Sequence, residues 1–340
     1  MELNDGVVSL IVPCWNGEKT IARCLDSILA QTYRKIELIV VNDGSEDGTH
    51  QIIISKEPAL KKALWDFQYV VQDNAGVGAA VNAALKKFTG EFLTLLDADD
   101  TIMPESIARK ATWLQEHPDY AVVRSNGFYV RAGRPGAARW LFYEKEDEPQ
   151  STDLFADLIS GKAKNWAGSY MIRASVWLAR CGNREIFPSR NGQNLQLLLP
   201  AAYQTKAGFL AEPLMNYMLR QDSLSHFSDD VSGEKALAAS AGYQEIYETV
   251  IRSVCGREEI PKILRKIRAT FCRSRMRIAI SVRNQSLLWE NYKELKEQER
   301  ATLDDRIDYY GLRAPAVSYF LRGIRKTRTA LRRLMRNDVR

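Results

Sequence analysis

The residues with the clearest chemical potential are three aspartates, Asp97, Asp99 and Asp100, which follow the apolar run 92–96. A short apolar run that ends at polar residues is typical of a buried strand. Asp97 and Asp99 lie two positions apart, so an extended backbone points both side chains to one face. Crowded carboxylates repel one another unless a cation lies among them, and their oxygens suit Mg²⁺ or Mn²⁺. The segment alone leaves two interpretations open: a metal site, or a solvated acidic turn that caps the helix after Pro104.

The elements that must position these aspartates alternate in type along the first half of the chain. We expect strands at residues 7–12, 36–41, 67–71 and 92–96, and helices at 18–30, 48–56 and 77–88. Strands separated by helices of about a dozen residues form parallel βαβ units with right-handed crossovers. The continuous apolar character of these strands fits a sheet that is covered on both faces.

Polar side chains gather where each predicted strand ends. They are Asn16, Asp43, Asp73, Asn74, Asp97 and Asp99. In parallel α/β sheets the carboxyl ends of the strands meet at one edge, and ligands bind there. Four polar clusters on the same edge predict a binding crevice, which favours a ligand site over an acidic turn.

Length and composition bound the architecture. A chain of 340 residues, 45% of them hydrophobic and 26% charged, buries a large core and suggests one large domain with appendages, or two domains. We predict a first domain at 1–230 and a helical, basic region at 231–340. No apolar segment approaches the roughly 20 residues that span a bilayer, and the acidic start does not resemble a signal peptide. Five scattered cysteines without zinc spacing favour a reducing, cytoplasmic compartment.

The net charge of +6 is unevenly distributed. Residues 261–283 hold eight basic and no acidic side chains, and residues 322–340 hold eight basic side chains and one acidic one. This asymmetry predicts an anionic surface as a partner. Residues 317–335 have the pattern of a basic amphipathic helix, which either lies in a membrane interface or packs, solvated, on the body. No nucleic-acid-binding motif accompanies the charge, so nucleic acid is not an expected partner.

Four motifs occur in a fixed order in the first 100 residues, at 12–18, 41–45, 74–82 and 96–100. Together they closely resemble the motifs of the family 2 glycosyltransferases, and a weaker similarity extends to about residue 226. The resemblance implies an α/β fold of the GT-A class, a Rossmann-like mixed sheet flanked by helices. It also implies an inverting enzyme that moves a sugar from a nucleotide-sugar donor, UDP-linked, to a glycan or polyprenyl-linked acceptor. Such enzymes often extend surface polysaccharides at the inner membrane face.

The resemblance assigns roles to the residues of the four motifs. Those that would contact the donor are Pro13, Trp15, Asn16, Glu18, Asp43, Asn74, Gly76 and Asp97. The first four flank the nucleotide base, and Asp43 accepts a hydrogen bond from a uracil-type ring N–H. Asn74 and Gly76 match the loop near the ribose and the sugar. Asp99 matches the ligand of a Mg²⁺ or Mn²⁺ ion that bridges the donor phosphates.

Later segments resemble the family more weakly. Residues 220–226 match the loop that closes over the diphosphate, where Arg220 would pair with phosphate oxygens and His226 would contact the metal or a phosphate. Trp166, Gly168 and Ser169 match a segment that lines the acceptor pocket. A buried core tryptophan and a surface histidine remain open as alternative explanations of Trp166 and His226.

Two departures from the family pattern concern catalysis. The family has an arginine where this chain has Val81, so a cation near the diphosphate is absent at that position. It also supplies the catalytic base as Glu-Asp, where this chain has Gln193 and Asn194, and an amide does not take up a proton near neutral pH. We expect the base elsewhere, with Asp222 as the first candidate, followed by Glu185 and Asp100. Two alternatives remain: the alignment is shifted, although no acid lies between Glu185 and Glu212, or the protein binds a sugar nucleotide without transferring the sugar.

Overall fold

The computed structural model describes residues 2–131, 139–189, 192–219 and 232–313. By their internal contacts these residues fall into two units, the first made of 1–226 and 246–256, the second of 227–245 and 257–340. The boundary predicted between residues 230 and 231 lies outside the described residues and stays a prediction.

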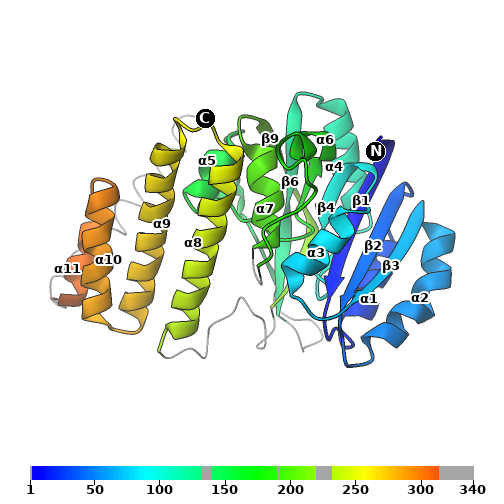
Figure 1. Cartoon of the computed structure of the whole chain (residues 1–340), viewed down its shortest axis with the longest axis horizontal. Coiled ribbons are helices and arrows are strands. Elements are labelled where there is room, and N and C mark those ends of the chain that lie inside the picture. Colours follow the sequence, from blue (N-terminus) through cyan, green and yellow to red (C-terminus); the bar gives the residue numbers. More distant parts are fainter. Residues whose placement is uncertain (1, 132–138, 190–191, 220–231, 314–340) are drawn as a thin grey trace. The chain divides into compact units, whose positions relative to one another are not determined.

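The first unit is built on one mixed sheet, to which the described residues contribute nine strands. They are β1 (Asn4–Cys14), β2 (Ile36–Asp43), β3 (Asp66–Gln72), β4 (Gly90–Leu95), β5 (Thr101–Ile102), β6 (Tyr120–Arg131), β7 (Arg139–Leu141), β8 (Tyr170–Arg173) and β9 (Lys206–Leu219). The strand order is β3-β2-β1-β4-β8-β6-β9-β5, and β7 pairs with β6 (Figure 1). Strands β3, β2, β1 and β4 run parallel, whereas β8 lies antiparallel between β4 and β6. The four predicted strands therefore form one parallel group, and β6 and β9 form a second parallel pair.

Seven α-helices of the described residues lie wholly in the first unit. They are α1 (Ile21–Leu29), α2 (Thr49–Ala63), α3 (Val77–Leu85), α4 (Ser106–Glu116), α5 (Leu154–Ile159), α6 (Ala174–Arg180) and α7 (Gln193–Ala202), and Lys145–Asp147 is a 3₁₀ turn. Helix α2 extends beyond its predicted end because it continues through Pro58. Ile53 and Leu60, seven positions apart on one helix face, are both fully buried, and their packing stabilises the longer helix.

The strand register aligns the carboxyl ends of the parallel strands. Cys14 of β1 lies opposite Asn42 of β2, and Asp43 lies opposite Gln72 of β3. On the other side of β1, Ile11 lies opposite Leu95, so β4 ends beside the same edge. The interiors of β1 and β2 are almost completely buried, as expected for a parallel sheet covered on both faces. The polar residues that follow these strands are thus brought to one edge.

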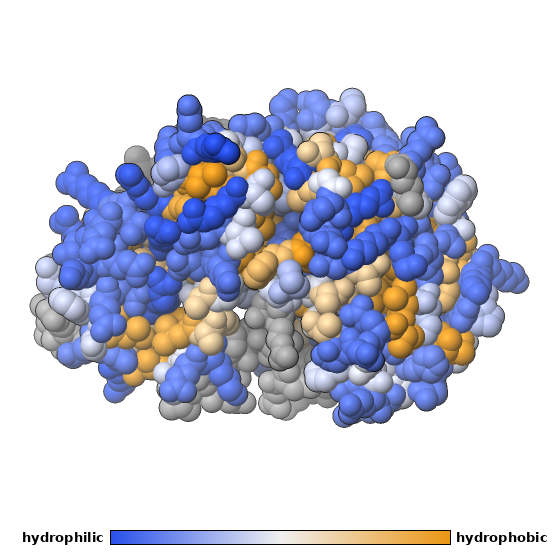
Figure 2. All heavy atoms as spheres, in the orientation of Figure 1, coloured by the Kyte–Doolittle hydropathy of each residue, from blue (hydrophilic) through white to orange (hydrophobic). Residues whose placement is uncertain are grey.

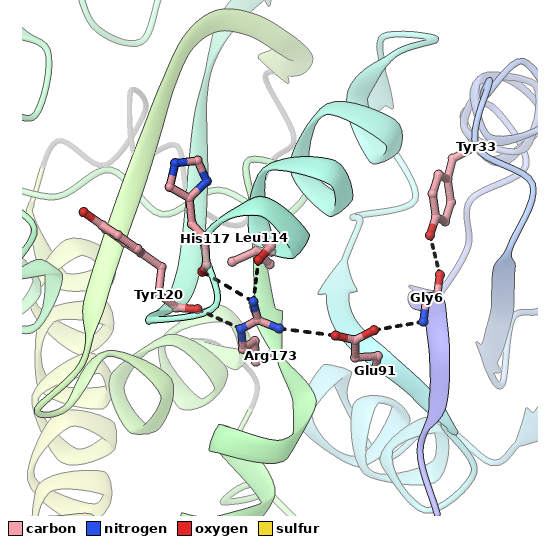
Figure 3. A network of polar contacts seen from close by, with 7 residues as sticks. All are labelled: Gly6, Tyr33, Glu91, Leu114, His117, Tyr120 and Arg173. Carbon is pink, nitrogen blue, oxygen red and sulfur yellow. Dashed lines mark hydrogen bonds and ion pairs between the residues drawn. The ribbon is translucent and has the colours of Figure 1, made fainter.

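The opposite edge of the sheet is held by a network centred on Arg173 of β8 (Figure 3). Its guanidinium donates to three main-chain carbonyls, those of Leu114, His117 and Tyr120. It also forms an ion pair with Glu91 at 3.2 Å, and Glu91 accepts a hydrogen bond from the amide of Gly6 at 2.8 Å. The network therefore joins the start of β1, the start of β4 and the end of α4.

The second unit is helical in its described part. Its helices α9 (Ile260–Ser281), α10 (Gln285–Gln298) and α11 (Leu303–Arg313) pack on one another (Figure 1), and α8 (Glu234–Val254) contributes residues to both units. Arg273 forms a two-pronged ion pair with the buried Asp305, with both N–O distances 2.8 Å. Arg275 donates to Asn291 and Gln244 and pairs with Glu294 at 3.1 Å. Two of the eight basic residues at 261–283 thus hold the helices together.

Figure 2 shows hydrophobic residues in separate patches among hydrophilic ones on the face drawn. Among the described residues, no helix combines the length and the apolar character needed to cross a membrane. All five cysteines are described, none forms a disulfide, and four of them, Cys14, Cys24, Cys255 and Cys272, are buried.

Candidate functional site

The loop after β1 and the loop after β2 are tied together by hydrogen bonds. The Asn16 amide donates to the Ser45 hydroxyl at 3.0 Å, and the Asn16 side chain accepts from the Glu46 amide at 3.0 Å. Glu18 accepts from the Gly48 amide at 3.1 Å. The predicted base-binding residues Asn16 and Glu18 therefore shape these two loops. Trp15, at the tip of the first loop, is 57% exposed, while Pro13 is buried in β1.

Asp43 lies at the end of β2 and is only 3% exposed. One carboxylate oxygen accepts from the Gln72 side chain at 2.7 Å and from the Ala75 amide at 3.0 Å, and the other accepts from the Gly76 amide at 2.8 Å. The carboxylate is thus held in place by the loop that follows β3. The two oxygens accept three hydrogen bonds, so the second oxygen keeps the capacity to accept one more.

Two glycines allow the loops around Asp43 to come close. Gly44 has a φ of +69°, and a Cβ there would lie 2.6 Å from the amide nitrogen of Asn74. Gly76, with a φ of +90°, precedes the first residue of α3. Both values lie in the left-handed region that L side chains rarely adopt. Gly44 and Gly76 therefore bring Asn74 and the start of α3 beside Asp43, as the sequence predicts for this edge.

The turn after β4 gathers the three aspartates. Asp97 and Asp99 are partly exposed. Burial and the nearby charge of Asp99 raise the pKa of Asp97 to about 7, although a hydrogen bond from Gln193 opposes the shift. Carboxyl groups that hold their protons in this way are more readily ionised when a cation lies among them.

Asp100 is fully buried and differs in role from its neighbours. One of its oxygens accepts from the Met218 amide of β9 at 2.8 Å, whereas the other is buried and has no hydrogen-bond partner among the described residues. Burial and the charges of Asp99 and Asp97 raise the pKa of Asp100 well above its usual range. Because it is inaccessible, Asp100 is poorly placed to take a proton from an acceptor hydroxyl. Its unpartnered oxygen also fits a site made for a cation.

Helix α7 brings the two amides of the predicted base position to the carboxylates. The Gln193 side chain donates to Asp97 at 3.3 Å, and the Asn194 side chain accepts from the Tyr170 hydroxyl at 3.0 Å. The segment in which the resemblance places the base thus lies beside Asp97. An acid at position 193 would face Asp97 with like charge, whereas the amide forms a favourable contact with it.

A cation that the sequence did not indicate lies near the carboxylates. Arg23 of α1 is exposed and donates to the main-chain oxygen of Asp99 at 2.9 Å. Val81, where the family has arginine, is fully buried. The side-chain amide of the neighbouring Asn82 donates to the Ile186 carbonyl at 2.9 Å and accepts from the Ile186 amide at 2.8 Å. No local pattern marks Arg23, because its position depends on how α1 packs beside the turn after β4.

The segment predicted to line an acceptor pocket lies next to β4. The Gly168 amide donates to the Leu95 carbonyl at 2.6 Å, and the Ser169 hydroxyl donates to the Trp166 carbonyl at 2.6 Å. Lys110 of α4, 1% exposed, donates to the Gly168 carbonyl at 2.9 Å and to the Ser106 hydroxyl at 2.6 Å. Burial lowers the pKa of Lys110 to about 7. No local sequence pattern marks this lysine as buried.

Of the remaining predicted residues, the structure describes Glu185 alone. Arg220, Asp222 and His226 lie outside the described residues. Glu185 pairs with Lys86 at 2.9 Å, just past the end of α3 that is remote from Gly76, and so is not beside the aspartates. Within the described part of the chain, no three His, Cys, Asp or Glu side chains are grouped to hold a metal ion. Asp97 and Asp99 nevertheless lie two positions apart on the turn after β4, and the unpartnered Asp100 oxygen beside them fits a nearby cation.

Comparison with known proteins gives the sequence relationships. Residues 9–171 match the family Glycosyl transferase family 2. The curated glycosyltransferase GlyA of Streptococcus pneumoniae is 41% identical over 100 residues, which are 29% of this chain and 14% of GlyA. Across three such curated relatives, the matched part is 14–43% of the relative's length. The chain thus spans less than half of the length of these relatives.

Solved structures give the fold relationship. The chain is similar to S. aureus TarS in complex with UDP-GlcNAc, with a TM-score of 0.58, 19% identity, and 90% and 91% of the two chains covered. It is also similar to the mannosyltransferase PcManGT of Pyrobaculum calidifontis in complex with GDP-Man and Mn²⁺, with a TM-score of 0.54, 16% identity, and 98% and 86% covered. At these identities the likeness shows the fold, which is the predicted GT-A fold. Residues 9–171 of this chain thus form a domain that matches glycosyltransferase family 2.

Proposed function

We propose that the chain transfers a sugar from a nucleotide-sugar donor, UDP-linked, to a glycan or polyprenyl-linked acceptor with inversion at the anomeric carbon. We further propose that this reaction serves the synthesis of a surface polysaccharide. The observation that carries the proposal is the placement of Asp43 and of the aspartates 97, 99 and 100 at the carboxyl ends of β2 and β4, the two strands that flank β1 in one sheet. The family match and the UDP-sugar bound to one structural neighbour support it.

The nucleotide would bind at the ends of β1 and β2. The second oxygen of Asp43 has room for the ring N–H of a uracil base, and the carboxylate is already oriented by the Ala75 and Gly76 amides. The exposed ring of Trp15 lies on the loop that is tied to this edge and is available to stack on the base. A site held this way needs little rearrangement when the donor binds.

Asp97 and Asp99 would hold the divalent ion, Mg²⁺ or Mn²⁺, with Asp99 as the direct ligand. When bound, such an ion stabilises the charge that develops on the leaving diphosphate. Arg23 supports the same end of the site, since it is bonded to the main chain of Asp99. Arg220 and His226 stay predicted as further contacts to the phosphates and the metal.

The transfer itself would be a single displacement. An acceptor hydroxyl attacks the anomeric carbon, the bond from that carbon to the diphosphate oxygen breaks, and a base takes the hydroxyl proton. One displacement of this kind inverts the anomeric configuration. Because Asp100 is buried and Glu185 is remote, Asp222 stays the predicted base.

The proposal is tested by nucleoside diphosphate release from a panel of UDP- and GDP-sugars, with Mn²⁺, with Mg²⁺ and with a chelator. We expect release with at least one UDP-sugar, and we expect D99N to lower kcat by about 100-fold or more, because a charged ligand is lost. The matched control is D66N, which changes an exposed aspartate at the start of β3. Full turnover by D99N with an accepted donor would show that the metal mechanism is wrong.

A second candidate is a protein that binds the sugar nucleotide without catalysing transfer. The contact of Gln193 with Asp97 favours it, because an amide stands where a base is expected. This candidate predicts that UDP binds, as measured by calorimetry, while no donor releases UDP in the presence of any acceptor. Release that is abolished in D222A would instead assign the base and exclude the second candidate.

A further inference from the structure

A row of aromatic side chains crosses three strands at the edge of the sheet that holds β7. Trp140 of β7 lies directly opposite Tyr129 of β6, and Tyr129 lies directly opposite Tyr217 of β9. Residues that face one another across paired strands point to the same side of the sheet. The ring centroids are 5.6 Å apart for Trp140 and Tyr129, and 5.9 Å apart for Tyr129 and Tyr217.

Trp166 completes this aromatic row. Its ring stacks on Tyr217 with the centroids 4.6 Å apart, and its indole N–H donates to the Tyr129 hydroxyl at 3.1 Å. The rings are therefore fixed relative to one another by stacking and by a hydrogen bond. The aromatic row, defined as Tyr129, Trp140, Trp166 and Tyr217, presents a rigid surface rather than four independent side chains.

The inner end of the aromatic row adjoins the carboxylates. Tyr217 is followed by Met218, whose amide donates to Asp100. Exposure rises in the other direction: Tyr217 is 9% exposed, Tyr129 and Trp166 are partly exposed, and Trp140 is 42% exposed. The row thus runs from the turn that would hold the donor phosphates to the solvent.

The chemistry of the row favours a polar ligand that has one apolar face. An exposed tryptophan on a three-residue strand next to further aromatic rings is typical of a binding surface. The Lys164 ammonium lies 5.8 Å from the Tyr129 ring centre and 4.7 Å from that of Tyr143. A hydrocarbon chain laid there would remove water from that charge, which is costly. A pyranose ring combines a face of C–H groups, which packs on an aromatic ring, with hydroxyls at its rim.

We propose that the aromatic row binds the saccharide part of the acceptor by stacking sugar rings on Trp140 and Tyr129. This inference rests on the proposed transfer, and it names the acceptor class as a chain of at least two sugars rather than a bare lipid phosphate. Neighbouring strands are about 4.8 Å apart, so the three strands of the row spread its rings over roughly 10 Å. That length exceeds one sugar ring, so the row contacts the acceptor beyond the residue that reacts.

The first test is binding without any donor, so that it is independent of transfer. A panel of linear oligosaccharides of glucose, mannose, galactose and N-acetylglucosamine is titrated against the full chain and followed by saturation-transfer NMR. We expect at least one to bind, and W140A to weaken that binding by about tenfold, as for the loss of one aromatic contact. W140F should restore most of it. The matched control is W65A, which removes a tryptophan that is 57% exposed at the start of β3.

The second test uses turnover. If UDP-sugar transfer is observed, W140A should raise the KM for the acceptor while the KM for the donor and UDP release to water stay unchanged. Failure of transfer with intact oligosaccharide binding would contradict the proposed function and leave the aromatic row supported. Three results would overturn the row as an acceptor site: no oligosaccharide binds the full chain, W140A and W65A bind equally well, or W140A weakens only polyprenyl phosphate in micelles.

Discussion

Lys110 is buried, where a charged group is costly, and it holds the turn at Gly168 next to the candidate site. Its ammonium bonds the Gly168 carbonyl and the Ser106 hydroxyl inside the first unit. Gly168 has a φ of +84° and lies against Leu96 and Ile102. Lys110 therefore fixes the turn that carries Trp166 to helix α4, while the Gly168 amide joins the same turn to Leu95 of β4. The cost of this arrangement depends on pH, because burial lowers the lysine pKa to about 7.

The pH dependence of the free energy of unfolding should contain a contribution from Lys110. Between about pH 7.5 and pH 10 the folded state holds Lys110 neutral while the unfolded chain holds it protonated, so unfolding takes up a proton. Stability conferred by this group therefore rises with pH, by up to about 1.4 kcal/mol per pH unit. Buried carboxyl and thiol groups with raised pKa values act in the opposite direction, so the informative quantity is the difference between variants. We expect the slope of the free energy of unfolding against pH, measured by urea unfolding, to be more positive in the wild type and in the control K61M, whose lysine is exposed, than in K110M. A K110M variant with the same slope would contradict the assignment.

At the scale of elements, the two ends of the parallel strands differ in role. The amino ends of β1 and β4 are held by a structural network, whereas the carboxyl ends carry the candidate site. The Arg173 network joins β1, β4, β8 and the end of α4 away from the aspartates (Figure 3). Removal of its guanidinium takes one donor from each of three carbonyls and from the Glu91 carboxylate. Buried groups left in this state lower the free energy of unfolding more than exposed ion pairs do.

We expect R173M to lower the free energy of unfolding by about 2–4 kcal/mol. The donor affinity of the folded fraction should be unchanged, because the network lies at the opposite edge from Asp43. The control K206M removes an exposed ion pair with Asp119 and should cost less than about 1 kcal/mol. Equal losses in both variants, measured by urea unfolding, would show that the network is not a structural anchor.

The parts of the fold that local sequence predicts are the parallel strands and the helices between them. Strand β8, with four residues, and strand β9, with Pro213 in its interior, were not predicted. Their pairing depends on residues far away in the chain, as in the pair of Phe92 with Arg173. In the site, the clustering of Asp97 and Asp99 is local and predictable. The contact from Gln193 joins residues 96 positions apart, and only the folded chain reveals it.

At the scale of the whole molecule, the distribution of basic residues has two explanations. In the range 261–283, Arg273 and Arg275 form ion pairs inside the helical unit. The segment 317–335, which the sequence predicts as a basic amphipathic helix, lies outside the described residues. We propose that it attaches the chain to an anionic membrane from the cytoplasmic side.

Liposome flotation tests this attachment. The full chain should float with vesicles that contain anionic lipid and remain in solution with neutral vesicles, since each basic residue near an anionic surface contributes about 1 kcal/mol. A chain that ends at residue 314 should lose flotation. R273A serves as a control, because its charge is used within the helical unit. Equal flotation with and without residues 315–340 would remove the proposal.

The buried cysteines have a practical consequence for experiments on the aromatic row. Four of the five thiols are inaccessible, and burial raises the pKa of the remaining one, Cys181, to about 11, so little thiolate forms near neutral pH. A cysteine introduced at an exposed position beside Trp140, such as 139, would therefore react with a maleimide dye far faster than any native thiol. The wild-type background is already suited to site-specific labelling, and a dye at that position would report directly when a sugar chain arrives.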